Sequence, residues 1–128
     1  MKLMVRRAPF QVRPLKPILV KPFHRPGWVY EEKVDGWRIV ACKDGRKVSL
    51  VSRRGVDPMA RFPGAAKAIG SLPSEALVLD GEVAVFDERP VSRFDLLSDP
   101  DLDVVVTPPV YVAFDVLYAG QQDYRAQP

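Results

Sequence analysis

The sequence contains one cysteine, Cys42, and one histidine, His24, and this scarcity excludes several chemistries. A single cysteine cannot form an internal disulfide, which fits a reducing cytosol. Because Cys42 follows Val40 and Ala41, we expect it to be a small strand residue and not a nucleophile. A lone histidine in a proline-rich stretch supports neither a histidine-based metal site nor a Ser-His-Asp triad.

Long apolar runs are also missing. No segment approaches the length of a membrane span, and no charged start is followed by an apolar stretch and a small-residue cleavage site. We therefore expect a cytoplasmic protein that is neither membrane-bound nor secreted. With 128 residues, of which 47% are hydrophobic, the chain is one domain at most and has enough apolar residues for a core.

Acidic side chains are absent from residues 1–30, which carry a charge of +7, whereas residues 75–128 carry −8. Residues 1–27 also contain five prolines, so this basic arm cannot be a helix and should run extended over the surface. Such an arm could lie along a phosphate backbone, although a solvated tail is an equally good interpretation. We treat residues 28–128 as the folded body.

The alternation of apolar residues predicts an α+β fold in which an antiparallel β-sheet carries short flanking helices. The expected strands cover residues 28–33, 37–43, 46–52, 76–86 and 110–118. Asp44-Gly45 is the strongest hairpin signal in the chain and should join the second strand to the third. Gly120 should then begin a tail.

Two short helices are expected. Pro63 suits the start of a helix that ends by Gly70 and covers one side of the sheet. A second helical turn or two should follow Ser92, with Ser92 as the N-cap and Asp95 in the capping-box position.

Two clusters of ionisable residues interrupt the strands. Residues 31–38 read Glu-Glu-Lys-Val-Asp-Gly-Trp-Arg, in which Asp35 is expected to shape a turn. In the strand 76–86, Gly81 predicts a bulge or a close backbone approach. Asp80 and Glu82 flank it on one strand face, where two carboxylates repel unless a cation or hydroxyl meets them. This argues for a site, although an edge strand would also accommodate such a pair.

The stretch from Lys33 to Arg38 resembles the nucleotidyl-transfer motif Lys-x-Asp-Gly-x-Arg of the ATP-dependent DNA ligase family, which includes RNA ligases and mRNA capping enzymes. Three later stretches resemble further family segments in the expected order, namely Ser52-Arg53-Arg54-Gly55, Leu79-Asp80-Gly81-Glu82 and Ala113-Phe114-Asp115-Val116-Leu117-Tyr118. The lead-in Pro17-Ile18-Leu19 and Pro26-Gly27-Trp28 is similar to that of compact bacterial end-joining ligases.

The resemblance implies that the Lys33 amine attacks the α-phosphorus of ATP, forms a lysyl-AMP and releases pyrophosphate. AMP then passes to the 5′-phosphate of nicked or broken double-stranded DNA, and attack by the 3′-hydroxyl seals the strand. An amine attacks only in its neutral form, which partial burial between strands and nearby cations favour. We expect Arg38, Arg53 and a divalent metal ion, Mg²⁺, to be these cations.

The resemblance also assigns five nucleotide-binding residues. Glu31 would accept a hydrogen bond from the adenine amino group, and Arg38 and Arg53 would contact ribose or phosphates, where a planar guanidinium outperforms an ammonium group. Glu82 would meet the ribose hydroxyl or the metal ion. Phe114 would stack on the purine, although its residue type alone favours ordinary core packing.

In the family, a second glutamate-containing segment, a lysine-rich segment and an oligonucleotide-binding barrel follow the segments matched here. We therefore expect a truncated adenylation domain that is weakly active or inactive alone, exposes apolar surface, and could be completed by a chain that supplies the missing half. Two alternatives stay open: a capping-type or RNA-ligase relative, and a non-catalytic nucleic-acid-binding remnant that uses the basic arm.

Overall fold

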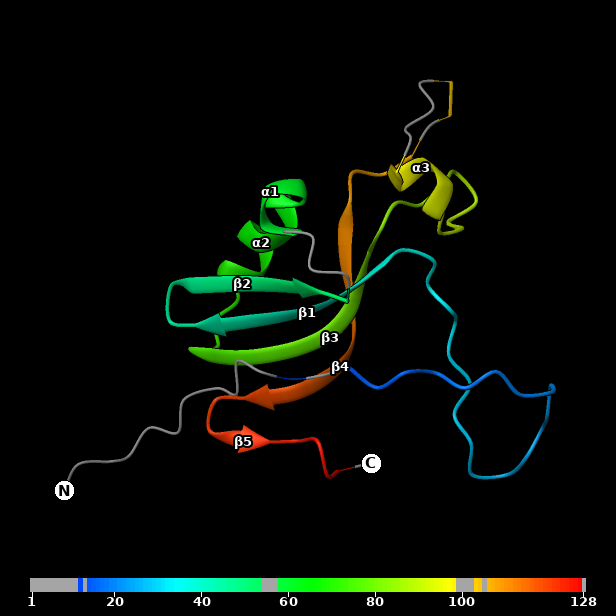
Figure 1. Ribbon diagram of the computed structural model, residues 1–128, viewed down its shortest axis with the longest axis horizontal. Helices are drawn as coiled ribbons and strands as arrows, with labels where there is room; N and C mark the ends of the chain where they lie inside the picture. Colours follow the sequence, from blue (N-terminus) through cyan, green and yellow to red (C-terminus); the bar gives the residue numbers. More distant parts are fainter. Residues whose placement is uncertain (1–11, 13, 54–57, 99–102, 105, 128) are drawn as a thin grey trace.

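The computed structural model describes residues 12, 14–53, 58–98, 103–104 and 106–127. Within them the chain forms one antiparallel sheet with strand order β2-β1-β3-β4-β5 (Figure 1). The strands are β1 (Trp37–Asp44), β2 (Lys47–Ser52), β3 (Ala76–Ala84), β4 (Val110–Ala119) and β5 (Gln122–Asp123). The helices are α1 (Pro58–Arg61), α2 (Pro63–Gly70) and α3 (Phe94–Ser98). The predicted α+β class is confirmed.

Local signals place the first hairpin and the central strand correctly. Asp44 pairs with Lys47, and Gly45 between them has a φ of +58°, which a glycine adopts without strain. β3 lies between β1 and β4, and all of its residues except Glu82 are buried. Asp80 and Glu82 therefore lie on a central strand and not on an edge.

The prediction of a strand at residues 28–33 is wrong. Residues 14–36 form no helix or strand, and the β1 ladder begins at Trp37. Both edges of β1 are occupied, by β2 and β3, so no ladder position remains for a preceding strand. Trp28 and Tyr30 contact the ring of Phe23 in the arm instead, at centroid distances of 4.9 Å and 6.2 Å.

Three further details differ from expectation. Gly120, with a φ of +62°, does not begin a tail, because it turns the chain into β5, which pairs with the end of β4. α1 has no counterpart in the sequence-based assignment. α3 begins at Phe94, so Ser92 is not its N-cap, and the Ser92 hydroxyl instead accepts a hydrogen bond from the backbone of Asp35. No helix in the described part of the chain has the length and hydropathy to cross a membrane.

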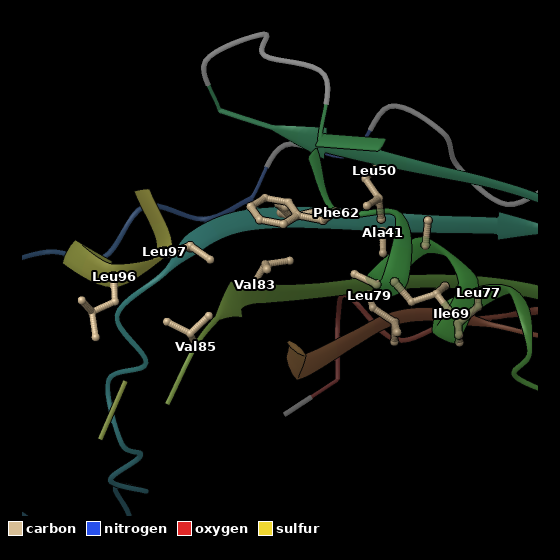
Figure 2. Close-up of a cluster of buried hydrophobic side chains, with 13 residues drawn as sticks. Ala41, Leu50, Phe62, Ile69, Leu77, Leu79, Val83, Val85, Leu96 and Leu97 are labelled. Carbon is tan, nitrogen blue, oxygen red and sulfur yellow. The ribbon is translucent and has the colours of Figure 1, made fainter. Parts of the chain in front are cut away.

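The main core lies between one face of the sheet and the helices. Phe62, which joins α1 to α2, is 3% exposed and packs edge-on against Trp37. Figure 2 shows Ile69 of α2 beside Leu77 of β3 at one end of this cluster, and Leu97 of α3 near Val85 at the other. The helices thus cover one face, as the apolar side of α2 predicts.

The opposite face carries a smaller cluster. Its buried members are Val40, Cys42, Ala76, Val78 and Tyr118, and Val12 and Leu117 pack against them. Cys42 is 1% exposed, and burial raises the pKa of its thiol, so the expectation of a small strand residue is confirmed. This face continues toward the start of β1, where polar residues replace the apolar ones.

Exposed apolar side chains gather on the arm, which leaves the body of the protein as a long loop (Figure 1). Leu15, Ile18 and Leu19 are 87%, 84% and 99% exposed, and Trp28 is 59% exposed. The expectation of exposed apolar surface is confirmed, but that surface is concentrated in residues 15–30, the arm and the three residues after it, and less on the sheet.

Candidate nucleotide site

The candidate site lies at the end of the sheet where the chain enters β1. Arg38 is the second residue of β1, and its partner across the ladder in β3 is Glu82. Because side chains alternate along a strand, Arg38 shares a face with Val40, whose ladder partner is Asp80. Arg38, Asp80 and Glu82 therefore lie together on the face opposite α1 and α2.

Arg38 and Asp80 form a bidentate ion pair. Nε and Nη2 of Arg38 each donate to one carboxylate oxygen of Asp80 at 2.6 Å. The Asp80 side chain is 4% exposed and that of Arg38 is 20% exposed, so the pair is mostly removed from water. The hydrogen bonds to Asp80 raise the pKa of Arg38 despite its burial. The cation that the two carboxylates of β3 require is thus Arg38.

The same guanidinium lies over the ring of Phe114, with Cζ 4.9 Å from the ring centroid. Gly81 pairs with Ala113 and Asp80 pairs with Asp115, which leaves Phe114 as an extra residue in β4. This irregularity is the bulge that Gly81 predicts. A Cβ at Gly81 would lie 2.3 Å from the Val112 carbonyl oxygen, so the close approach needs glycine.

Glu82 links this cluster to the segment that carries Lys33. Burial raises the pKa of Glu82. A hydrogen bond from the Gly36 backbone and the positive charges of Lys33 and Arg38 act in the opposite direction and offset part of this effect. Lys33 is therefore near enough for its charge to act on this carboxylate. A Cβ at Gly36 would lie 2.2 Å from the Val83 carbonyl oxygen, so only glycine fits where this segment meets β3.

Lys33 itself is exposed, so the expectation of partial burial between two strands is wrong. The reason is that β1 begins at Trp37, four positions later, and no strand precedes it. Glu31 is exposed in the same segment. Arg53 is also exposed and follows β2, where the pairing of Ser52 with Ile39 brings it to the Arg38 end of β1.

The structure thus brings Arg38, Glu82 and Phe114 together, with the charge of Lys33 acting on Glu82, and leaves Glu31 and Arg53 exposed. Sequence reasoning did not assign Ser92 to the site. Its hydroxyl accepts from the Asp35 amide across 57 positions of sequence, a contact for which the sequence gives no local signal.

A metal ion would find few protein ligands here. Within the described residues, no group of three or more His, Cys, Asp or Glu side chains is arranged to hold one. Asp80 is committed to Arg38, so Glu82 is the carboxylate that fits such a role, as one ligand. Mg²⁺ commonly takes one or two carboxylates and completes its shell with phosphate oxygens and water.

The sheet and the site define a nucleotidyltransferase fold, which two solved structures share. The ligase domain of LigD from M. tuberculosis matches with a TM-score of 0.59 and 32% identity, over 73% of this chain and 30% of that chain. A mycobacterial DNA ligase D, solved in complex with ATP and MES, matches over the same fractions with a TM-score of 0.58 and 32% identity.

The family follows from the sequence match. Residues 9–128 match the ATP dependent DNA ligase domain, and the chain belongs to this family. DNA ligase C2 of Mycolicibacterium smegmatis is 34% identical over 126 residues, which cover 90% of this chain and 35% of that protein. The multifunctional non-homologous end joining protein LigD of Pseudomonas aeruginosa is 34% identical over 84% of this chain and 13% of its own length. The resemblance to bacterial end-joining ligases is confirmed, and the chain spans about a third of DNA ligase C2.

Proposed function

We propose that this chain is the nucleotide-binding portion of an ATP-dependent DNA ligase and that Lys33 receives the adenylyl group. The observation that carries the proposal is the convergence of Arg38, Glu82 and Phe114 beside the segment of Lys33. A guanidinium, a carboxylate and an aromatic ring are the groups that bind phosphate, a ribose hydroxyl or metal, and a purine.

In the proposed reaction, the neutral Lys33 amine attacks the α-phosphorus of ATP. A nitrogen–phosphorus bond forms, the bond from the α-phosphorus to the bridging oxygen breaks, pyrophosphate leaves, and the amine loses a proton to solvent. Arg38 and Arg53 supply positive charge toward the phosphates, and Glu31 accepts from the adenine amino group. Glu82 would be one ligand of a bound Mg²⁺, which would supply charge neutralisation at the phosphates.

The ring of Phe114 has one face under the Arg38 guanidinium, so a stacked purine would use the other face or displace Arg38. Asp80 favours the first arrangement because it holds the guanidinium in place through two hydrogen bonds. Since Lys33 is exposed here, the surroundings that favour its neutral form are incomplete, and we propose that a polypeptide corresponding to the rest of the ligase completes them.

The proposed substrate after adenylylation is nicked or broken double-stranded DNA. Lys16, Lys21 and Arg25 are exposed on the arm and can face phosphates. The same observation supports the second candidate, a nucleic-acid-binding protein without catalysis. The two differ in their dependence on Lys33, because DNA binding by the arm does not need this amine.

The test is incubation with ATP labelled at the α-phosphate, followed by mass spectrometry of the covalent adduct. We expect slow adenylylation confined to Lys33, abolished in Lys33→Ala and unchanged in Lys47→Ala, which removes an exposed lysine of β2. GTP in place of ATP should give little adduct, which separates a ligase from a capping-type relative. Salt-sensitive DNA binding that survives in Lys33→Ala, without adduct or ATP-dependent stabilisation in the parent chain, would support the non-catalytic alternative.

A further inference from the structure

Residues 31–36, which carry Lys33, belong to no helix or strand, so ladder hydrogen bonds do not fix them. Two consecutive amides of this segment are instead held by side chains from elsewhere. The Asp35 amide donates to the Ser92 hydroxyl at 2.9 Å, and the Gly36 amide donates to Glu82. Both anchors lie within three residues of Lys33.

Ser92 is itself held in place by a tightly bonded loop, residues 86–93. The loop is closed by an isolated bridge between Phe86 and Ser92, and the Arg93 amide donates to the Val85 carbonyl at 2.9 Å. Inside the loop, Oδ1 of Asp87 accepts from the amides of Arg89 and Val91, at 3.0 Å and 3.1 Å. The Ser92 hydroxyl is therefore presented from a fixed position.

The loop extends directly from β3, the strand that supplies Asp80 and Glu82. Phe86 follows the end of β3 by two residues, and the Asp87 amide donates to the Val91 carbonyl at 3.0 Å. The Lys33 segment is consequently attached at two adjacent points to one continuous piece of chain, through Glu82 in the strand and through Ser92 in the loop.

We propose that Ser92 is a positioning residue, which holds the Asp35 amide so that the Lys33 amine stays aligned with the nucleotide bound by Arg38, Glu82 and Phe114. This inference rests on the proposed adenylylation of Lys33. The Ser92 hydroxyl bonds the Asp35 amide, so its effect on the Lys33 amine passes through the backbone of residues 33–35. Alignment of a nucleophile with its target contributes strongly to rate, and small displacements are costly.

The experiment compares Ser92→Ala and Ser92→Thr with the parent chain. Ser71→Ala is the matched control, because the Ser71 hydroxyl is exposed and bonds the Ala68 carbonyl at the end of α2. Amide hydrogen exchange at Asp35 is measured by NMR, and adenylylation of Lys33 is measured by mass spectrometry as a function of ATP concentration.

In Ser92→Ala we expect about tenfold faster exchange at Asp35 and an about tenfold lower adenylylation rate at saturating ATP, with little change in the half-saturating ATP concentration. Ser92→Thr retains the hydroxyl and should restore both values, and Ser71→Ala should change neither. If Ser92→Ala only lowered stability, amide exchange would change throughout the sheet. It would also not lower the adenylylation rate selectively while leaving the half-saturating ATP concentration unchanged.

Unchanged exchange at Asp35 in Ser92→Ala would overturn the contact. Faster exchange with an unchanged adenylylation rate would overturn the positioning role. A parent chain that forms no adduct on Lys33, even with the polypeptide corresponding to the rest of the ligase supplied, would overturn the proposed function, and the exchange difference would then show Ser92 to be structural only.

Discussion

Arg38 lies between Asp80, which accepts two of its hydrogen bonds at 2.6 Å, and the ring of Phe114, whose centroid is 4.9 Å from its Cζ. One guanidinium thus neutralises a buried carboxylate of β3 and orients an aromatic ring of β4. The ion pair of Arg38 and Asp80 therefore contributes both to the stability of the fold and to the geometry of the candidate site. Removing either charge should affect both properties.

Substitution Arg38→Gln should destabilise the fold by about 3 kcal/mol, because it leaves the Asp80 carboxylate, 4% exposed, without its cation. Arg125→Gln is the control, since Arg125 forms a comparable pair with Asp123 whose side chains are almost half exposed, and little change is expected there. Urea unfolding measures both. Equal effects of the two substitutions would contradict the assignment of a structural ion pair at Arg38.

Glu82→Gln should change how stability depends on pH. Burial raises the pKa of Glu82 above its ordinary value of 4.5, so the folded chain holds this proton more tightly than the unfolded chain does. Ionisation of Glu82 therefore opposes folding as the pH rises through and above that value. Relative to the parent, Glu82→Gln should gain stability between about pH 4 and about pH 7, measured as the urea midpoint. A relative loss over this range would contradict the raised pKa.

Gly81→Ala should destabilise the sheet by about 2 kcal/mol or more, because the new Cβ would lie 2.3 Å from the Val112 carbonyl oxygen and 2.8 Å from the Tyr111 ring. Gly64→Ala provides the opposite case. Gly64 is in α2 with no atom within 4 Å of the added Cβ, so alanine should stabilise by roughly 0.5 kcal/mol. Thermal unfolding of both variants measures the two stability changes. An unchanged melting temperature in Gly81→Ala would exclude the close approach at the bulge.

Lys43→Met should cost about 2 kcal/mol. The Lys43 side chain is buried, and Nζ donates to the carbonyl oxygens of Leu72 and Ser74 at 2.6 Å each. Methionine keeps the apolar stem but leaves both carbonyls without this donor. Lys47→Met, at an exposed position of β2, should have little effect in the same denaturant titration. If Lys43→Met were as stable as Lys47→Met, the hydrogen bonds from Lys43 to the Leu72 and Ser74 carbonyls would not contribute to stability.

The features that sequence predicted correctly depend on neighbouring residues. The Asp44-Gly45 hairpin follows from a turn preference, and the bulge follows from a glycine inside an apolar strand. The need for a cation beside Asp80 and Glu82 also follows from their two-residue spacing. That Arg38 supplies it depends on the register between β1 and β3, which the local pattern does not specify.

The predictions that were wrong depend on contacts between distant residues. The apolar run at Trp28–Tyr30 is typical of a strand, but β1 has no free edge to receive one. Ser92 has the residue type and spacing of an N-cap, yet its hydroxyl meets an amide 57 residues earlier. The role of Phe114 came from family resemblance, and its contact with Arg38 supports but does not test purine stacking.

The position of Cys42 gives the protein a natural reporter of its own opening. As the only thiol in the chain, it is enclosed in β1 between two ladders, with 1% of its surface exposed. Its side chain lies in the apolar cluster on one face of the sheet, so a thiol reagent can modify it only when that cluster opens. The rate of modification therefore records how often the apolar face that adjoins the candidate site opens, and a bound nucleotide that stabilises this face would slow the modification without any introduced label.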